Sequence, residues 1–385
     1  MFRTSLIILA VFAALAFGTT YVLQSDAVVQ VSNSVRVAEA MSSSDTTGYA
    51  RAVETIEFEF PQDHGPHPDF KTEWWYYTGN VKSKSGRRFG YQFTIFRIAL
   101  SPTPAERTSD WATSQMYMAH FALSDLDGGE FYSFERFSRG AQGLAGAQSV
   151  PFRVWLEDWQ TKNAPGSKPL FPKHFLSASG KNVSINLTLE STKPLVYQGK
   201  NGLSQKSSER GNASYYYSMT RIKTDGTITI GDEEFEVFGW SWKDREWSTS
   251  ALAEGQVGWD WFSLQLSNGE EIMFFQLRNE DISRPPFSKG TVVYKDGQSR
   301  QIKNGEVLLE ELSIWESPHG GKYPARWRFQ IPADSVDIEI RSNLPDQELD
   351  VSVRYWEGSV SIDGKRGSSS ISGHGYVEMT GYGDR

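Results

Sequence analysis

A short segment that ends at Asp244 carries the side chains best placed for chemistry. Alternate residues of an extended strand face the same side, so Phe238, Trp240, Trp242 and Asp244 share one face. A carboxyl group among aromatic rings loses hydration, which raises its pKa and keeps a proton available for donation. Such an acid could protonate an alkene or a leaving oxygen while the rings stabilise positive charge. The alternative is structural, with Asp244 in an ion pair with Arg245 or another cation.

The end of the chain repeats this arrangement of an aromatic residue followed two positions later by an acid. Tyr376 and Glu378 lie on one face of a predicted strand, together with Ser372 and His374. This face matches the face that carries Asp244. We therefore expect Tyr376 and Glu378 to contribute to substrate binding.

The segment EWWYYTGNV, which begins at Glu73, places aromatic rings on both faces of a predicted strand. Glu73, Trp75 and Tyr77 share one face, and the intervening residues take the other. Both faces are therefore expected to be covered, one of them by ordinary core packing. On the first face, Glu73 is a candidate catalytic acid or base, and Trp75 and Tyr77 are candidates for substrate binding.

Two further polar residues lie within apolar strands. His120 shares a face with Met118 and Ala122 and could act as a general base; a hydrogen-bonded core histidine is the alternative. Arg97 ends a long apolar strand, where it could hold an anionic group of a ligand or pair with a carboxylate.

The segment DHGPHPDF brings Asp63, His64, His67 and Asp69 close together, and divalent metals bind such side chains. Its two histidines, however, are separated by a proline-containing loop and lack the helical spacing of known zinc motifs. We therefore predict no metal site. The predicted acid chemistry also needs no cofactor, and the chain contains no Gly-x-Ser-x-Gly elbow and no phosphate-binding glycine loop.

The composition limits the partners of the protein. The chain has 385 residues, a formal net charge of -8 and an aromatic share of 14%. Nucleic-acid binding needs clustered Lys and Arg to contact phosphates, so the acidic balance argues against nucleic acid as a partner. Cysteine is absent, which excludes disulfides, thiol catalysis and cysteine zinc sites. The many rings indicate broad apolar surfaces.

The first residues predict export. Residues 1–23 carry one positive charge, Arg3, before the uncharged run SLIILAVFAALAF, which ends with a small-x-small cleavage site. We favour a cleaved signal peptide and a periplasmic or secreted location. The alternative is an uncleaved anchor that associates the protein with a membrane or the cell envelope. Residues 24–52 are polar and small, which predicts a disordered linker.

From residue 53 onward, short alternating segments are separated by glycine and polar turns, as is typical of an antiparallel sandwich or barrel. The two halves of this region also resemble each other. VSINLTLESTKP is similar to VDIEIRSNLP, GWSWKD is similar to GHGYVE, and a further match aligns Trp75 with Trp261. We therefore predict an all-β fold of two tandem antiparallel domains, residues 53–234 and 235–385.

Several longer motifs resemble those of one known family. They are HPDFKTEWWYYTGNV, MAHFALSD, GNASYYYSMTR, GWSWKDREWS, GWDWFSLQLSNGEEIMFFQLR and GHGYVEMTGY. These motifs are similar to the AttH and carotenoid 1,2-hydratase family, and the match covers nearly everything after about residue 55. The resemblance implies two lipocalin-like barrels packed together. It also implies relatives that act on isoprenoid or polyene substrates, including hydratases and pericyclases.

The resemblance also implies site residues. The proton donor of the hydratases corresponds to Asp244, and the aromatic residue two positions before it corresponds to Trp242. The hydratases carry His-x-Trp on the preceding strand, where this chain has Tyr215-x-Tyr217. Because the imidazole is missing, the resemblance predicts the fold better than it predicts carotenoid hydration.

Together, these features predict an exported protein that binds a long apolar small molecule, an isoprenoid or a lipid, in an aromatic chamber. As an enzyme it would use Asp244 as the acid for hydration, hydrolysis, isomerisation or cyclisation, with Trp240, Trp242, Tyr215 and Tyr217 lining the site. A non-catalytic carrier or envelope-associated binding protein would use the same chamber without turnover. In a third alternative, the rings serve only to pack two barrels together.

Overall fold

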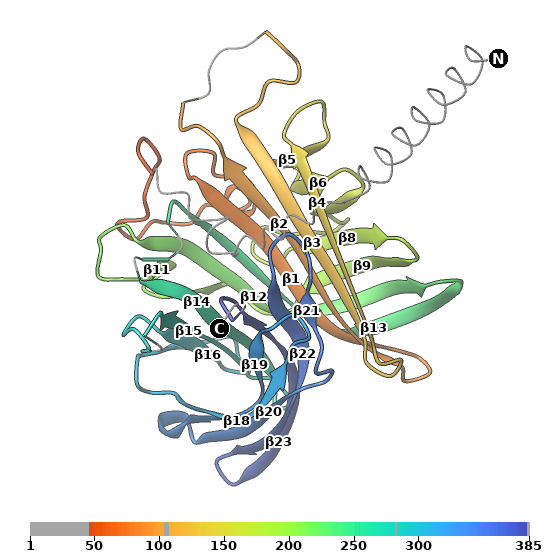
Figure 1. Cartoon of the computed structure of the whole chain (residues 1–385), viewed down its shortest axis with the longest axis vertical. Helices are drawn as coiled ribbons and strands as arrows, with labels where there is room; N and C mark the ends of the chain where they lie inside the picture. The colour runs from red at the N-terminus through yellow and green to blue at the C-terminus, as the bar shows by residue number, and fades with distance from the viewer. Residues whose placement is uncertain (1–45, 104–107, 251, 254, 282, 383–385) are drawn as a thin grey trace, which may run out of the picture. The chain divides into compact units, whose positions relative to one another are not determined.

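The computed structural model describes residues 46–103, 108–250, 252–253, 255–281 and 283–382. Within these residues the regular structure is almost entirely β-strand, and the helical elements are two short 3-10 turns, η1 (Gln62–His64) and η2 (Pro332–Asp334). The strands form two antiparallel sheets (Figure 1). The predicted all-β fold with two tandem antiparallel parts is therefore confirmed.

The first sheet has 13 strands and curls into a nearly closed barrel. In order across the sheet its main strands are β4 (Glu130–Arg139), β3 (Gln115–Asp125), β2 (Arg88–Ala99), β1 (Thr72–Ser83), β13 (Glu233–Ser248), β12 (Ala213–Ile230), β9 (Val183–Ser191), β8 (Lys173–Gly180), β7 (Trp159–Asn163), β6 (Arg153–Leu156) and β5 (Ala145–Gln148). Two short strands pair with β12, namely β10 (Val196–Tyr197) and β11 (Leu203–Gln205).

The second sheet has 10 strands and forms a half-barrel. Its main strands, in order, are β17 (Ser299–Ile302), β16 (Lys289–Val293), β15 (Glu271–Asn279), β14 (Gln256–Leu266), β23 (Ser369–Met379), β22 (Tyr355–Arg366), β20 (Val336–Ser342), β19 (Lys322–Ile331) and β18 (Leu308–Glu316). The short strand β21 (Glu348–Leu349) pairs with β22.

The strand order shows the internal repeat directly. The run β3-β2-β1-β13-β12-β9-β8 of the first sheet corresponds to β16-β15-β14-β23-β22-β20-β19 of the second. Tyr76 pairs with Asp244 in the first sheet, and Trp261 pairs with Glu378 in the second. Tyr76, rather than Trp75, is therefore equivalent to Trp261, so the alignment predicted from sequence is corrected by one residue.

The division between the two sheets lies after Ser248, where β13 ends. The predicted boundary between residues 234 and 235 falls inside β13, which pairs with β1 and β12 along its length. The internal repeat explains the difference. β13 lies between β1 and β12 in the first sheet, just as β23 lies between β14 and β22 in the second, so each repeat ends with this strand.

The N-terminal predictions fall largely on residues that the structure does not describe. The proposed signal or anchor, residues 1–23, lies outside the described residues and stays a prediction. The end of the predicted linker is packed on the first barrel, since Ala52 is buried and the Tyr49 hydroxyl donates to the Ala99 carbonyl over 2.9 Å. The described residues include no helix of the length and apolar character that a membrane span requires.

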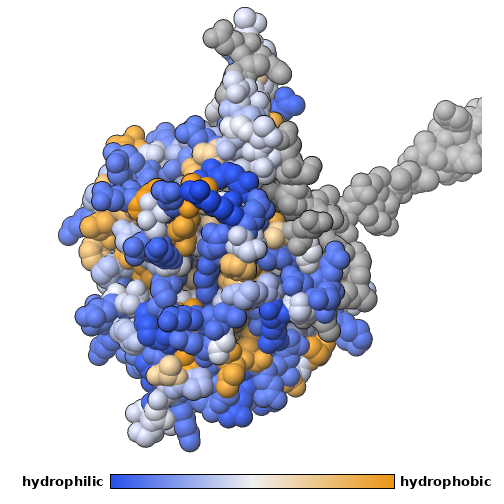
Figure 2. All heavy atoms as spheres, turned by 90° about the vertical axis from the view of Figure 1, so that its left-hand side faces the viewer, coloured by the Kyte–Doolittle hydropathy of each residue, from blue (hydrophilic) through white to orange (hydrophobic). Residues whose placement is uncertain are grey.

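The apolar side chains fill two separate interiors. The interior of the first barrel is a cluster of buried aliphatic and aromatic residues contributed by strands all around the sheet, and the half-barrel has a similar cluster of its own. A third cluster lies between the sheets and includes Tyr76, Tyr216, Trp242, Trp261 and Tyr376. Figure 2 shows one face of the molecule, where hydrophilic residues predominate and hydrophobic ones form scattered patches. The third cluster borders the candidate site.

A buried lysine inside the first barrel opposes the stability of the fold. The Lys243 amine lies 5.2 Å from the ring centre of Tyr77 and 4.7 Å from that of Phe152. Within the described part of the chain this amine has no hydrogen-bond partner. Burial lowers the pKa of Lys243 well below its ordinary value, and the nearby Arg245 lowers it further. The unfolded chain therefore binds this proton more tightly than the folded chain does.

We expect Lys243→Met to raise the free energy of unfolding by about 1 to 3 kcal/mol at neutral pH, because it removes a buried polar group that lacks a partner. The gain should shrink as the pH approaches the ordinary lysine pKa of about 10.4, since the unfolded chain then releases the same proton. Urea unfolding of both proteins at neutral and alkaline pH measures the effect. A loss of stability at neutral pH would contradict it.

Candidate active site

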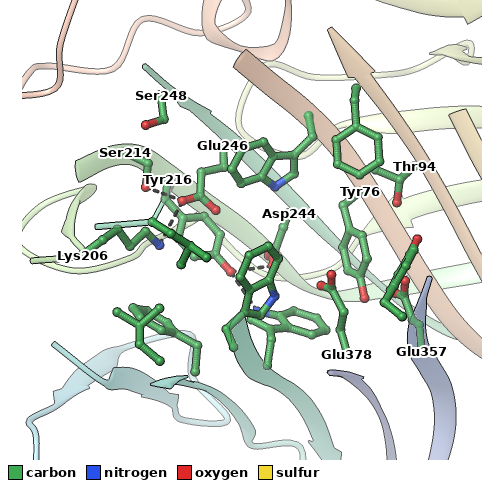
Figure 3. Close-up of a pocket in the computed structure, with 18 of the residues that line it drawn as sticks. Tyr76, Thr94, Lys206, Ser214, Tyr216, Asp244, Glu246, Ser248, Glu357 and Glu378 are labelled. Atoms are coloured by element: carbon green, nitrogen blue, oxygen red, sulfur yellow. Dashed lines mark hydrogen bonds and ion pairs between the residues drawn. The ribbon is translucent and has the colours of Figure 1, made fainter. Parts of the chain in front are cut away.

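A cavity of about 90 Å³ lies between the two sheets (Figure 3). Aromatic and aliphatic side chains make up much of its wall, together with four carboxyl groups and one lysine. The lining residues are Trp74, Tyr76, Thr94, Phe96, Lys206, Ser214, Tyr216, Asp244, Glu246, Ser248, Ser250, Leu252, Trp259, Trp261, Phe275, Leu277, Tyr355, Glu357 and Glu378. The first sheet contributes β1, β2, β12 and β13, and the second contributes β14, β15, β22 and β23.

Strand alternation decides which side chains reach this cavity. On β1, Trp74 and Tyr76 face it, whereas Trp75 and Tyr77 point into the first barrel. The same alternation on β12 turns Tyr216 toward the cavity and its two neighbouring tyrosines toward the barrel. The rings on both faces of β1 are thus covered, as the sequence predicted.

The carboxyl group of Asp244 is held by three hydrogen-bond donors. Ser218 Oγ and Trp242 Nε1 donate to Oδ1 over 2.6 and 2.7 Å, and the Tyr216 hydroxyl donates to Oδ2 over 2.5 Å. Asp244 itself is buried. The sequence-based alternative, an ion pair between Asp244 and Arg245, is not formed, because the two side chains leave opposite faces of β13.

Burial raises the pKa of Asp244 from its ordinary value to about 7. The three donors, from Ser218, Tyr216 and Trp242, favour the ionised form and lower the pKa, whereas the negative charge of Glu246 raises it. Burial outweighs the donors because no cation lies against this carboxyl group in the described structure. Asp244 therefore carries a proton over much of the range up to neutral pH, and it can release that proton near neutrality.

Tyr216 links Asp244 to the opposite sheet. Its hydroxyl accepts a hydrogen bond from Trp261 Nε1 over 3.1 Å while it donates to Asp244. The ring of Trp261 also meets that of Tyr76 edge to face, with the ring centres 5.1 Å apart. Such contacts hold the ring faces and the acid in fixed positions, which is the preorganisation that acid catalysis needs.

A separate ion pair lies at another part of the cavity wall. The Lys206 amine lies 3.0 Å from Glu246 Oε1, and Ser214 Oγ donates to the same oxygen. Lys206 also lies 4.4 Å from the ring centre of Phe275. Glu246 is therefore neutralised by its own partner and is a weaker candidate than Asp244 for proton transfer.

The predicted catalytic residue Glu73 does not reach the cavity. Its two carboxylate oxygens form buried ion pairs with Arg97 and Arg245, and the His67 backbone N–H donates to it over 3.1 Å. Burial alone would raise the pKa of Glu73, but the two guanidinium groups outweigh burial and hold the pKa far below its ordinary value. Glu73 is thus permanently ionised, and its assignment as an acid or base is corrected to a structural role.

The predicted ligand contact Arg97 takes part in the same structural cluster. Besides Glu73, it donates to the Phe70 carbonyl over 2.7 Å and to Gln115 Oε1 over 2.6 Å. The alternative stated for Arg97, pairing with a carboxylate, is therefore the one that the structure bears out.

His120 does not line the cavity but contacts a residue that does. Its Nδ1 is 2.8 Å from the hydroxyl of Tyr355, which lines the cavity, and its Nε2 is 3.0 Å from Glu135 Oε1. His120 is fully buried with both ring nitrogens bonded, which matches the core-histidine alternative. It can orient Tyr355 but does not line the site directly.

The predicted aromatic residues divide between three places. Trp75, Tyr77, Tyr215 and Tyr217 belong to the interior of the first barrel, so their assignment as substrate contacts is corrected: they face away from the cavity. Trp242 and Tyr376 are buried behind the cavity wall in the cluster between the sheets. Trp240 lies further along β13, where the Arg221 guanidinium stacks over its ring at 5.2 Å. Of the predicted residues, Asp244 and Glu378 line the cavity itself.

Sequence reasoning missed several residues of the site, among them the rings of Tyr76 and Trp261 and the polar groups of Tyr216 and Glu357. The parity of β12 was the available signal for Tyr216, since Ser218 pairs with Asp244 and Tyr216 shares its face. The internal repeat was the signal for Glu357, because it pairs with Glu378 as Ser218 pairs with Asp244.

The histidines of the DHGPHPDF segment have hydrogen-bond partners within the protein. His64 Nδ1 lies 2.6 Å from the Tyr217 hydroxyl and Nε2 lies 2.7 Å from the Pro169 carbonyl, while His67 Nε2 lies 3.1 Å from Asp63. Burial lowers the pKa of His64 to about 3. Among the described residues, no group of three or more His, Cys, Asp or Glu side chains is arranged to hold a metal ion.

The sequence matches a family model described as AttH-like over residues 51–382. The chain belongs to the AttH-like family. Among solved structures, an AttH protein from Nitrosomonas europaea is 31% identical, and the alignment covers 86% of this chain and 99% of that chain with a TM-score of 0.75. All residues that line the cavity lie within the part of the chain that the AttH-like family model matches.

Hydratases are also among the proteins similar to this AttH-like chain. Kievitone hydratase from Fusarium solani subsp. phaseoli is 23% identical over 214 residues, which is 52% of this chain and 58% of that protein. The match therefore spans little more than half of that relative. Kievitone hydratase from Nectria haematococca has the same fold, with 16% identity, a TM-score of 0.64 and coverage of 86% of this chain and 95% of that one.

Proposed function

We propose that this AttH-like protein is a hydratase-like enzyme that adds water to a carbon–carbon double bond of an apolar substrate. The observation that carries the proposal is the buried carboxyl group of Asp244, whose pKa is raised to about 7 at the wall of an aromatic cavity. Similarity to a kievitone hydratase supports the same reaction class.

The reaction begins with proton transfer from Asp244 to one carbon of the double bond. The positive charge that develops on the other carbon lies among the rings of Tyr76, Trp261 and Tyr216, whose faces attract cations by about 0.5 to 2 kcal/mol each. Water then forms the carbon–oxygen bond and releases a proton. The apolar side chains of the wall lower the polarity around the reacting groups, which strengthens each of these interactions.

The cavity volume restricts the part of the substrate that enters. A volume of about 90 Å³ accommodates a short branched alkene end and a water molecule rather than an entire long isoprenoid or lipid. Among the described residues, the interior of the first barrel is packed with buried aliphatic and aromatic side chains of its own strands. This favours an enzyme that acts on one end of its substrate over a carrier that encloses a long ligand.

Labelled water provides the test of this function. We expect the full chain, incubated in ¹⁸O water with kievitone and with simple trisubstituted alkenes such as 2-methyl-2-heptene, to form an alcohol that contains ¹⁸O. Mass spectrometry of the products measures it. Retention of these compounds without any ¹⁸O in the products would favour the carrier.

A further inference from the structure

The second repeat places two glutamates side by side on the wall of the cavity. Glu357 on β22 and Glu378 on β23 are directly opposite each other in the antiparallel register. Opposite residues on one face of a sheet have Cβ atoms about 4.5 to 5.5 Å apart, and two like charges at this spacing destabilise the sheet. The two carboxyl groups therefore avoid being ionised together.

No positive charge relieves this repulsion. Across the described residues, neither glutamate forms an ion pair, and neither oxygen of Glu357 has a hydrogen-bond partner. Glu357 is buried, and Glu378 is partly accessible from the cavity that it lines. Ionising a buried carboxyl group that has no partner costs much free energy. The cost is smaller when the negative charge is shared with a neighbouring carboxyl group through one proton.

The comparison with the first repeat shows what has changed. Ser218 pairs with Asp244, as Glu357 pairs with Glu378, so a hydrogen-bond donor in one repeat is replaced by an acid in the other. Tyr76 belongs to neither pair, but Figure 3 shows its hydroxyl pointing toward the two glutamates. That hydroxyl also has no hydrogen-bond partner in the described structure. The cavity thus has a single acid on one sheet and a pair of acids on the other.

We propose that Glu357 and Glu378 hold at most one negative charge between them and that the singly ionised pair is the base that receives a proton from the attacking water. The inference rests on the proposed function and adds two catalytic residues to it. The pair lies on the opposite sheet from Asp244, so acid and base approach the double bond from different walls of the cavity.

The reaction then balances without any co-reactant other than water. Asp244 loses its proton to one alkene carbon, and the water oxygen forms a bond to the other. One proton of that water passes to the ionised oxygen of the pair, which leaves Glu357 and Glu378 both neutral. The pair returns this proton to Asp244 before the next turnover, and the net change is alkene plus water to alcohol.

Other charged and titratable groups face the pair and are consistent with this role. Burial raises the pKa of both glutamates, that of Glu378 to about 8, and the carboxylates of Glu246 and, once it is ionised, Asp244 act in the same direction on Glu378. The hydroxyls of Tyr76 and Tyr355 lie near Glu357 without forming a hydrogen bond to it, and their effect on its pKa is smaller than that of burial. Tyr355 is itself bonded to His120, and the Lys206 amine is paired with Glu246 rather than with either glutamate of the pair.

A titration that needs no substrate tests the shared proton. Glutamate labelled with ¹³C at the side-chain carboxyl group is followed by NMR in the wild-type protein, in Glu357→Gln and in Glu378→Gln. We expect the wild-type pair to titrate in two separated steps, one of them above the range of ordinary glutamates. Each substitution should remove one signal and shift the remaining step to lower pH. Simultaneous ionisation of both groups at acidic pH, or no shift in either variant, would overturn the proposal.

Kinetics test the role as a base separately from the role of Asp244. On an alkene that the wild-type enzyme hydrates in D₂O, Glu378→Gln should slow alcohol formation by about 10² to 10⁴-fold. It should still exchange deuterium into recovered alkene, because Asp244 remains able to protonate it. If Glu378→Gln formed the alcohol at the wild-type rate, the assignment of the glutamate pair as the base would be wrong. If the wild-type enzyme hydrates no alkene, the proposed function fails, and the titration still decides whether the proton is shared.

Discussion

Asp244→Asn should slow water addition by about 10² to 10⁴-fold, the usual contribution of a positioned general acid. Asparagine retains the shape of a protonated aspartic acid. Its carbonyl oxygen can accept from Ser218 and Trp242, whereas the bond to the Tyr216 hydroxyl, which donates to Asp244 in the wild type, is reversed because the amide nitrogen donates. The variant therefore keeps the cavity and its contacts but has no acidic proton. Steady-state rates of ¹⁸O alcohol formation measure the effect.

A second buried aspartate provides the matched control. Burial raises the pKa of Asp260 too, but this residue bonds to Tyr382 over 3.0 Å and lies against Arg278, outside the cavity lining. We expect Asp260→Asn to retain the wild-type rate per folded molecule. Equal rates in Asp244→Asn and in the wild type would contradict the assignment of the acid.

The stability of the Asp244 variant gives an independent check on the same pKa. The folded protein holds this proton up to about pH 7, whereas the unfolded chain loses it near 3.9. Wild-type stability contributed by this group is therefore complete below the unfolded value and is lost as the pH rises through 7. The free energy of unfolding of Asp244→Asn relative to the wild type should thus increase between these two pH values.

Glu73→Gln should lower the free energy of unfolding by about 3 to 5 kcal/mol, the cost of breaking a buried ion pair. Glu73 is fully buried, and its single carboxylate neutralises both Arg97 and Arg245. Glutamine would leave two buried guanidinium groups without a counter-charge. Arg245 also stacks on the Trp75 ring at 4.1 Å, so the damage should extend into the first barrel. Chemical denaturation measures the change.

An exposed carboxylate provides the control for this second substitution. Glu236 pairs with Lys84 at the surface, where both side chains are mostly exposed and water screens the pair. We expect Glu236→Gln to leave the unfolding transition almost unchanged. An equally small change in the free energy of unfolding for Glu73→Gln would contradict a stabilising role of the buried ion pairs that Glu73 forms with Arg97 and Arg245.

Much of the fold was predictable because the sequence repeats itself and alternates strictly. The matched segments GWSWKD and GHGYVE lie on β13 and β23, which occupy equivalent places in the two sheets. Parity alone put Trp242 and Asp244 on one face, and the structure joins them by a hydrogen bond. The boundary between the parts was harder, because β13 follows β12 without a break in pattern.

The site was predicted only in part, for a physical reason. Parity separates the two faces of a strand but does not say which face meets a neighbour when both carry rings. On β1 this left Glu73 and Tyr76 equally eligible, and long-range ion pairs placed Glu73 inside the barrel. On β12 the motif comparison directed attention to Tyr215 and Tyr217, whereas the residue between them lines the cavity. Such outcomes depend on packing between distant segments.

A titration of the Asp244 carboxyl group tests most directly whether the aromatic cavity holds an acid that is ready to donate a proton. Infrared difference spectra of protein labelled with ¹³C aspartate, with Asp244→Asn to identify the band, follow this group through a pH titration. We expect a protonated carboxyl band that disappears with a midpoint of about 7. A carboxylate that is already fully ionised at mildly acidic pH would contradict it.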